Sequence, residues 1–272
     1  MSQVSGFFKY AKERYHVKLR RDSGQPAPWT KDPVIAGFRF CHIFREDDRT
    51  TAWLRENIRE PLRDDPVKVA KAVIGFRIFN RITTGELLKP ILLRHGWSTK
   101  LARKKLTGVA PLVTGAYMVR SPYGMNKLTG LLQYMDGLID VRRLQQPTLQ
   151  AAHAELLQSP GWGAFTSYEI ICDLMYTSVL ENAIDKMTWA SPGPGAARGL
   201  EWIYGREFSR TSQAGIEEQV VLMRKILKSS QAKTNWPVEW PAWDMRTVEH
   251  TLCEYDKYRR GQLGRRLKRR YP

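Results

Sequence analysis

The chain has 272 residues, which is enough for one large domain or two small lobes with a buried core. Its 44 lysines and arginines exceed its 27 aspartates and glutamates by 17, and this excess favours a polyanionic partner such as nucleic acid or an anionic membrane. No stretch approaches 18 uncharged apolar residues and the N-terminus has no apolar signal core, so we expect a soluble, intracellular protein with no membrane partner.

Cysteine and histidine spacing narrows the choice of cofactors. Cys41, Cys172 and Cys253 lie far apart, and the five histidines form no pair at metal-ligand spacing. This spacing excludes a zinc ribbon and a four-cysteine iron–sulfur loop, and it makes a disulfide framework unexpected. The chain also has no P-loop for a nucleoside triphosphate. We therefore expect no cofactor and no protein-bound metal.

In chain order, residues 1–31 are polar and basic and end in a Pro-rich stretch, which predicts a basic N-terminal arm. Asp32 before Pro33 is typical of a helix start. Between residues 37 and 49 polar side chains recur at helical spacing, with aromatic and aliphatic side chains on the opposite faces. The polar positions are Arg39, His42, Glu46 and Arg49, flanked by Arg45 and Asp48. They form either a solvated, salt-bridged helix face or a functional cluster.

The middle of the chain continues the helical pattern. Asp65-Pro66 and Ser98-Thr99 are further helix starts. The uncharged run 106–119 has the length of a helix, but Pro111 and Gly115 interrupt it, so we expect one kinked buried helix or two short ones.

Two helical segments then flank a glycine turn, within residues 151–177. The turn reads Ser159-Pro-Gly-Trp-Gly, so Gly161 and Gly163 let the backbone approach a phosphate, and the following helix presents free N–H groups to it. The alternative is an ordinary helical hairpin with a glycine turn. Downstream, Asp185 is a candidate acid that could instead pair with Lys186 or cap a turn.

The last third holds a second glycine turn and two more helices. Gly193 and Gly195 open onto a helix with Arg198, an arrangement that suits a phosphate or pyrophosphate but also a plain loop. Residues 216–227 and 246–258 read as helices, and the tryptophans in the loop 229–243 either cover the core or stack on bases. With no alternating strand pattern, the fold class is all-α.

The last helix places three reactive groups on one face. Glu254, Lys257 and Tyr258 fall at i, i+3 and i+4, and from Lys257 to Arg270 there are eight positive charges and no acid. Such a run is usually solvated, but here it predicts contacts to a DNA backbone. The candidate DNA contacts in this run are Arg259, Arg260, Arg265 and Arg266.

Five ordered motifs support a family resemblance. They are Asp32-Pro-x-x-x-x-Phe-Arg-Phe-x-x-x-x-Arg-x-x-Asp-Arg, Thr114-Gly-Ala-Tyr, Phe165-Thr-Ser-Tyr-Glu-Ile-Ile-x-Asp-Leu, Gly193-Pro-Gly-Ala-x-Arg-Gly-Leu and Leu252-Cys-Glu-x-Asp-Lys-Tyr-x-Arg. Together they resemble the α-glutamyl/putrescinyl thymine pyrophosphorylases of bacteriophage thymine hypermodification, whose helical module is also fused to some 5-hydroxymethyluracil DNA kinases. The resemblance covers roughly residues 30–260, and the hairpin is similar to the helix-hairpin-helix of DNA glycosylases.

The resemblance implies a glycosylase-like fold of two helical lobes around a central cleft, in a domain 32–260 followed by a basic tail 261–272. It implies a transferase in the cytoplasm of the infected host cell. The enzyme replaces the phosphate or pyrophosphate on activated 5-hydroxymethyluracil in DNA with a small amine, such as an amino acid or polyamine. The implied partners are double-stranded DNA with the modified base flipped out and a separate 5-hydroxymethyluracil DNA kinase.

The resemblance also assigns site residues. Asp185 stands 22 residues after Gly163, about where such glycosylases carry their catalytic acid, and Phe165 occupies the position of a lyase amine, which disfavours Schiff-base chemistry. Asp185 or Glu254 would take the amine proton or polarise the uracil ring, with Lys257 beside them. Substrate and phosphate would contact Arg39, His42, Arg45, Arg49, Tyr168, Glu169, Asp173, Gly193, Gly195 and Arg198.

Two other functions remain open from the sequence. One is a monofunctional DNA glycosylase that uses Asp185 to release a modified base. The other is a non-catalytic DNA-binding module that uses the hairpin and the basic tail alone. The amine, the leaving group and the oligomeric state are not encoded in any segment that the sequence singles out.

Overall fold

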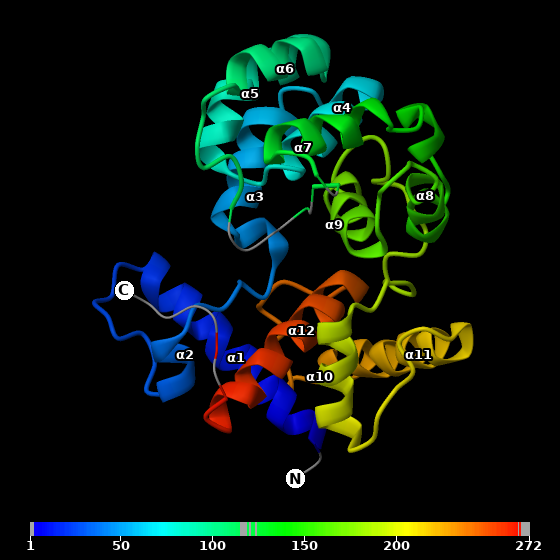
Figure 1. Cartoon of the computed structure of the whole chain (residues 1–272). Helices are drawn as coiled ribbons and strands as arrows, with labels where there is room; N and C mark the ends of the chain where they lie inside the picture. The colour runs from blue at the N-terminus through cyan, green and yellow to red at the C-terminus, as the bar shows by residue number, and fades with distance from the viewer. Residues whose placement is uncertain (1–2, 115–118, 120, 123, 266, 268–272) are drawn as a thin grey trace. The chain divides into compact units, whose positions relative to one another are not determined.

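The computed structural model describes residues 3–114, 119, 121–122, 124–265 and 267, and these residues form helices and turns without a β-strand (Figure 1). This confirms the all-α prediction. The chain divides into two compact units: unit 1 comprises residues 1–48 and 186–272, and unit 2 comprises residues 49–185. Within the described part of the chain, no helix is long and apolar enough to cross a membrane.

Unit 1 contains both ends of the chain. Its α-helices are α1 (Gln3–Asp22), α2 (Pro33–Gly37), α10 (Pro194–Tyr204), α11 (Gln213–Ser230) and α12 (Met245–Gln262), with a 3₁₀ turn η1 at Arg45–Asp47. α12 packs against α1, α2, α10 and α11, so it is the central helix of this unit.

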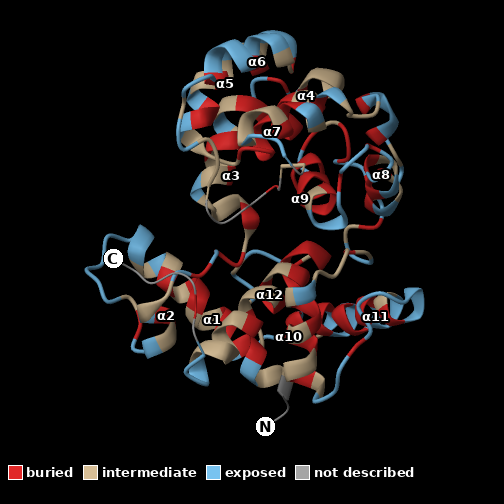
Figure 2. Ribbon diagram, in the orientation of Figure 1, coloured by how far each residue is buried: buried red, intermediate tan, exposed pale blue. Residues whose placement is uncertain are grey.

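Helix α1 replaces the expected N-terminal arm. Phe7, Phe8 and Tyr10 on this helix are at most 2% exposed and meet Trp243 and Tyr255 at ring-centroid distances of 5.5 to 5.8 Å. Aromatic burial of this extent is a large favourable contribution to folding, which explains why a chain segment with many charges is nevertheless part of the core. The buried positions of α1 appear as red segments in Figure 2.

The expected basic tail begins as the last turn of a helix and has one buried side chain further on. Gly261 and Gln262 belong to α12, and Leu267 beyond its end is 8% exposed. Of the two interpretations of the tryptophans in the loop before α12, packing on the core is correct for Trp236 and Trp243, which are 4% and 3% exposed.

Glycines permit the close packing of α10 on α12. A Cβ at Gly199 would lie 2.3 Å from the Leu252 carbonyl oxygen, and a Cβ at Gly195 would lie 2.3 Å from Cys253 Sγ. Both distances are far below van der Waals contact, so only glycine allows the two helices to approach this closely.

Unit 2 is a second helical body with its own core. Its helices are α3 (Arg49–Leu54), continued by a π-helical turn η2 (Arg55–Arg59), α4 (Pro66–Arg77), α5 (Ile82–His95), α6 (Thr99–Leu106), α7 (Lys127–Asp136), a 3₁₀ turn η3 (Val141–Leu144), α8 (Leu149–Leu156) and α9 (Ala164–Leu174). Fully buried Leu, Ile, Val and Phe side chains of α4 and α5 line its interior.

Helix starts were predicted more accurately than helix continuations. Asp32, Asp65 and Ser98 accept hydrogen bonds from backbone N–H groups of the helices that they precede, as expected for N-caps. The helix expected over 106–119 is wrong for residues 107–114, because α6 ends at Leu106 and Gly108 adopts a φ of +79°. Residues 115–118, which hold most of the Thr114-Gly-Ala-Tyr motif, lie outside the described residues.

The helix expected over 37–49 is also wrong. α2 ends at Gly37, and the backbone from Phe38 to Phe44 is non-helical before the 3₁₀ turn η1. Side chains, most of them from other elements, bind the backbone of residues 39–42 in place of helical hydrogen bonds. Those side chains define the candidate site.

Candidate functional site

Two motifs more than 200 residues apart meet in unit 1, where the segment 38–48 lies along α12. The Cys41 N–H donates to Glu254 Oε2 at 2.9 Å, and Lys257 Nζ donates to the Arg39 carbonyl oxygen. Lys257 Nζ also lies 3.5 Å from Glu254 Oε2 and 4.5 Å from the Phe40 ring centroid. The acid and the amine predicted to share one face of α12 therefore form an ion pair that also holds the backbone of this segment.

Helix α1 holds the same segment from another direction. Arg14, only 4% exposed, donates from Nε to the Cys41 carbonyl at 3.0 Å and from Nη2 to the Phe40 carbonyl at 3.1 Å. Its Nη1 is buried without a hydrogen-bond partner. A buried guanidinium that binds backbone carbonyls leaves a fixed positive charge beside the segment.

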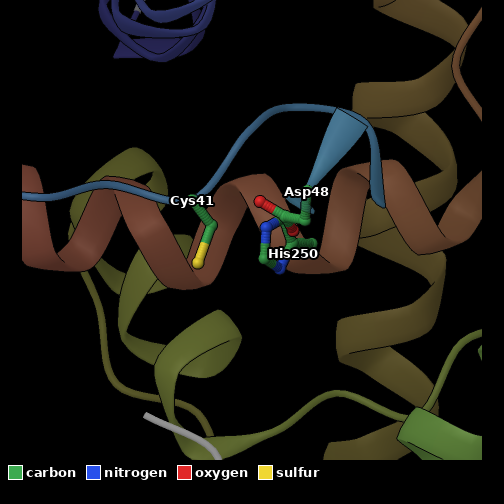
Figure 3. A group of neighbouring side chains, drawn as sticks. All are labelled: Cys41, Asp48 and His250. Atoms are coloured by element: carbon green, nitrogen blue, oxygen red, sulfur yellow. The ribbon is translucent and has the colours of Figure 1, made fainter. Parts of the chain in front are cut away.

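His42 connects the segment to two further side chains through its own peptide groups. Its N–H donates to Asp48 Oδ1 at 3.2 Å, and its carbonyl oxygen lies 3.1 Å from His250 Nε2. As Figure 3 shows, Asp48 and His250 lie side by side, with the Cys41 thiol on the same side of the loop. One ligand atom from each of Cys41, Asp48 and His250 lies within 4.8 Å of the others. These three residues could hold a metal ion.

Burial and nearby charges shift the titration of these groups. Burial raises the pKa of Asp48 to about 6, and the charges of Arg45 and Arg246 only partly oppose this effect. Burial and the charges of Arg14 and Arg21 lower the pKa of His42 to about 3. His42, predicted to bind phosphate, is therefore neutral at physiological pH and could only donate or accept a hydrogen bond there. Arg45 is buried beside Asp48.

The second glycine turn has structural partners inside unit 1. The Gly193 N–H lies 3.4 Å from Glu249 Oε1, so a carboxylate of the chain itself stands at the N-terminus of α10. Gly195 accommodates Cys253, as described above. Arg198 Nε donates to the buried Asp256 Oδ2 at 2.9 Å. These contacts explain the three candidate residues without a phosphate, and a phosphate role for them stays a prediction.

The basic end of α12 is partly paired. Arg260 Nε lies 3.1 Å from Asp256 Oδ2, and the Arg259 guanidinium stands 5.3 Å from the Trp202 ring centroid. Arg265 is exposed beyond the end of the helix, and Arg266 lies outside the described residues.

In unit 2, Asp185 anchors the first helix of the hairpin. Its Oδ1 accepts the Leu149 N–H at 2.7 Å and its Oδ2 accepts the Gln150 N–H at 3.0 Å, both in the first turn of α8. A carboxylate at a helix N-terminus satisfies unpaired N–H groups and the positive end of the helix dipole. Asp185 is 8% exposed. The capping alternative is therefore present in the structure, and a catalytic role remains a prediction.

Three predicted substrate contacts are buried side chains of α9 in unit 2. Tyr168, Glu169 and Asp173 on α9 are 4%, 9% and 0% exposed. Asp173 binds Arg77 of α4 through two hydrogen bonds of 2.5 and 2.8 Å. Arg49, by contrast, is exposed at the first position of α3.

The predicted hairpin forms, with α8 and α9 joined by a tight turn. Gly161 adopts a φ of +81°, a conformation that favours glycine, and Gly163 is the N-cap of α9 with open space where a Cβ would stand. No side chain caps α9. Phe165 in its first turn is 56% exposed. The turn therefore presents uncapped N–H groups on an accessible surface, as a phosphate-binding hairpin requires.

Comparison with known proteins places this arrangement in a family. The model for the helical domain of 5-hmdU DNA kinases matches residues 2–266 of the chain. The chain belongs to the 5-hmdU DNA kinase helical-domain family. It is similar to a 5-hmdU DNA kinase of Bacillus phage SP10, with 22% identity over 90% of this chain and 43% of the relative. It thus spans less than half of that relative's length, and no solved structure gave a significant match.

Family membership confirms one part of the resemblance drawn from the five motifs, the link to the helical module of 5-hydroxymethyluracil DNA kinases. The sequence did not point to Arg14 or His250, and it gave Cys41 no role in the site. No local pattern connects these residues, because they lie on α1, on α12 and in a loop. The usable signal for Asp256, which binds Arg198 and Arg260, was its place in the Leu252-Cys-Glu-x-Asp-Lys motif.

Proposed function

We propose that this protein is an amine:DNA transferase of phage thymine hypermodification. The substrate is DNA that carries a phosphate or pyrophosphate ester of 5-hydroxymethyluracil. The amine nitrogen attacks the exocyclic methylene, so a C–N bond forms while the C–O bond breaks and the phosphate or pyrophosphate leaves with the electron pair. The similarity to a phage 5-hmdU DNA kinase supports the pathway.

The observation that carries the proposal is the cluster of Glu254 and Lys257 against the segment 38–48. Glu254 Oε2 is engaged by Cys41 and Lys257, whereas Oε1 accepts no hydrogen bond from the described residues. An attacking amine must lose a proton, and a carboxylate with one unengaged oxygen can accept it. Asp185 has both oxygens bound to backbone N–H groups, so Glu254 is the better candidate base.

Cations around the segment suit a polyanionic leaving group. Arg14 and Arg45 are buried beside it, and Arg39 is exposed at its start. Fixed positive charges near the departing oxygen stabilise the negative charge that develops there. His42, neutral at physiological pH, would contribute only a hydrogen bond.

The hairpin between α8 and α9 is proposed to hold the DNA. Its uncapped N–H groups and the open space at Gly163 suit a backbone phosphate, as in the helix-hairpin-helix of glycosylases. Reaching the methylene group inside a duplex requires the base to leave the stack, which a glycosylase-like fold would support. The phosphate itself would come from a separate 5-hydroxymethyluracil DNA kinase in the cytoplasm of the infected host.

The test is a reaction of the purified protein with duplex DNA containing phosphorylated 5-hydroxymethyluracil and single amines, followed by nucleoside mass spectrometry. An aminomethyluracil adduct is expected with one amine, and absence of an adduct with every common amino acid and polyamine refutes the proposal. Glu254→Gln keeps an acceptor for Cys41 and should lower kcat by roughly 10²- to 10⁴-fold, the usual contribution of a general base.

Two results would instead support the other functions. Abasic sites that disappear with Asp185→Asn would identify a glycosylase. Salt-sensitive DNA binding without any product, unchanged by Glu254→Gln and Asp185→Asn, would identify a DNA-binding module.

A further inference from the structure

The residues Cys41, Asp48 and His250 combine sulfur, oxygen and nitrogen ligands from three places in unit 1. Their ligand atoms lie within 4.8 Å of one another. Cys41 comes from the loop after α2, Asp48 follows η1, and His250 stands on α12. A thiolate, a carboxylate and an imidazole are the three side-chain groups that bind Zn²⁺ most often.

The backbone of His42 orients two of the three groups. The His42 N–H binds Asp48 Oδ1, and the His42 carbonyl contacts His250 Nε2. Because a carbonyl oxygen can only accept, this contact places the proton on Nε2 and leaves the lone pair on Nδ1. A metal-binding histidine in proteins usually has its second nitrogen held in this way.

The loop that carries Cys41 is itself fixed. Glu254 accepts the Cys41 N–H and Arg14 donates to the Cys41 carbonyl, so both peptide groups of this residue have partners. Cys41 is exposed, and Asp48 and His250 are partly exposed, which gives an ion a route from solvent.

We propose that Cys41, Asp48 and His250 form a binding site for a zinc-type divalent cation, with a fourth position open to water or an anionic ligand. Zn–S and Zn–N bonds of about 2.3 and 2.0 Å in a tetrahedron place ligand atoms about 3.5 Å apart. The ligand atoms lie within 4.8 Å of one another, so they would approach by at most about 1.3 Å to reach this geometry. Binding breaks the Cys41 S–H bond, forms an S–Zn bond and releases one proton to solvent.

The charges of the occupied site balance. A thiolate and a carboxylate neutralise a divalent cation, so the occupied site as a whole carries no net charge beside Arg45 and Arg246, whose charges act on Asp48. Three protein ligands with one open position are typical of catalytic rather than structural zinc sites.

The test is titration of the full, chelator-treated protein with Co²⁺, which reports sulfur ligation through a thiolate-to-cobalt charge-transfer band. One Co²⁺ per chain with this band, displaced by Zn²⁺, is expected. Cys41→Ser should abolish the band, and His250→Gln should weaken Co²⁺ binding more than tenfold. Cys253→Ser is the control, because Cys253 lies on α12 near His250 but is not one of the three proposed ligands, so the band should stay unchanged.

Asp48→Asn keeps the acceptor for the His42 N–H and provides a second ligand variant, and circular dichroism confirms that each variant retains its helices. The Asp48→Asn substitution should also weaken Co²⁺ binding more than tenfold. Absence of the band in the unsubstituted protein overturns the proposal. So does a band that survives Cys41→Ser, or binding that neither His250→Gln nor Asp48→Asn weakens.

Discussion

Arg77 and Asp173 are opposite charges in the interior of unit 2, and the Arg77 guanidinium has several polar partners there. The guanidinium binds both oxygens of Asp173, Thr51 Oγ1 at 2.8 Å and Asn80 Oδ1 at 2.7 Å. Asp173 belongs to a family motif that the sequence suggested for substrate binding. Its observed contacts explain the residue as an anchor of α9 on α4, because a buried charge requires a partner.

We therefore expect the main effect of Asp173→Ala to be a loss of folding stability, not a direct effect on the reaction. It leaves the Arg77 charge buried without its partner, and the free energy of unfolding should fall by about 3–5 kcal/mol. Urea denaturation followed by circular dichroism measures the change. The control is Glu60→Ala, which removes an exposed acid 4.0 Å from Arg63 and should change stability by less than about 1 kcal/mol. Equal effects of the two substitutions would contradict this assignment.

The hairpin formed by α8 and α9 contains a histidine, His153, whose protonation can change its stability. The His153 ring on α8 contacts the Ala164 carbonyl of α9 at 3.1 Å, and burial lowers the pKa of His153 although this hydrogen bond opposes the shift. With a lowered folded-state pKa, the neutral ring contributes stability above the unfolded pKa of about 6.5, and this contribution is lost as the pH falls through the folded pKa.

Acidification below pH 6.5 should therefore loosen the hairpin. Hydrogen exchange of the α8 and α9 amides should accelerate between pH 7.5 and 5 beyond the intrinsic pH effect on exchange. His153→Gln keeps a donor for Ala164 but cannot be protonated, so its exchange should not show the extra acceleration. The same acceleration in the variant would show that another group is responsible.

Substitution of two glycines distinguishes a glycine needed for helix packing, Gly199, from one proposed to bind DNA, Gly163. Gly199→Ala places a Cβ 2.3 Å from the Leu252 carbonyl, so α10 must move away from α12, and stability should fall by roughly 1–3 kcal/mol. Gly163→Ala meets open space and should cost less than about 1 kcal/mol, the scale of an N-cap change. If the hairpin holds a phosphate, Gly163→Ala should weaken duplex binding several-fold in fluorescence anisotropy, while unchanged affinity would exclude the hairpin from the interface.

At the scale of the whole molecule, the sequence predicted features that depend on neighbouring residues better than features that depend on contacts between distant residues. The N-caps at Asp32, Asp65 and Ser98, the hairpin and the last two helices follow from nearby residues, and all of them form. The helix predicted over residues 37–49 was wrong because tertiary contacts from Arg14, Glu254 and Lys257 hold the segment 38–48 in a non-helical conformation. These three residues are distant in the sequence, so no local pattern could have revealed their contacts. The prediction of a basic N-terminal arm relied on the charges of this segment and overlooked its three aromatic residues, which are buried in the structure.

The meeting of Cys41 with His250 was unpredictable for a similar reason. Metal-ligand motifs are recognised by short spacing, whereas these two residues are 209 positions apart and come together only through the fold. The family motifs did indicate that residues 32–49 and 252–260 belong together, but they did not show that much of their role is to hold each other in place.

The net charge of +17 gives a final test that involves the whole molecule. If the protein binds duplex DNA through phosphate contacts, the logarithm of its affinity should fall linearly with the logarithm of salt concentration, by about 0.9 per contacted phosphate. Arg265 is exposed beyond α12, so Arg265→Ala should reduce the slope by about one contact and weaken binding without regard to base sequence. Arg142 is also exposed but pairs with Asp140, and Arg142→Ala should leave the slope unchanged because its charge is already compensated. Equal slopes for the unsubstituted protein and the Arg265 variant would show that the basic end of α12 lies outside the DNA interface, and a salt-independent affinity would remove DNA as the partner that the charge predicts.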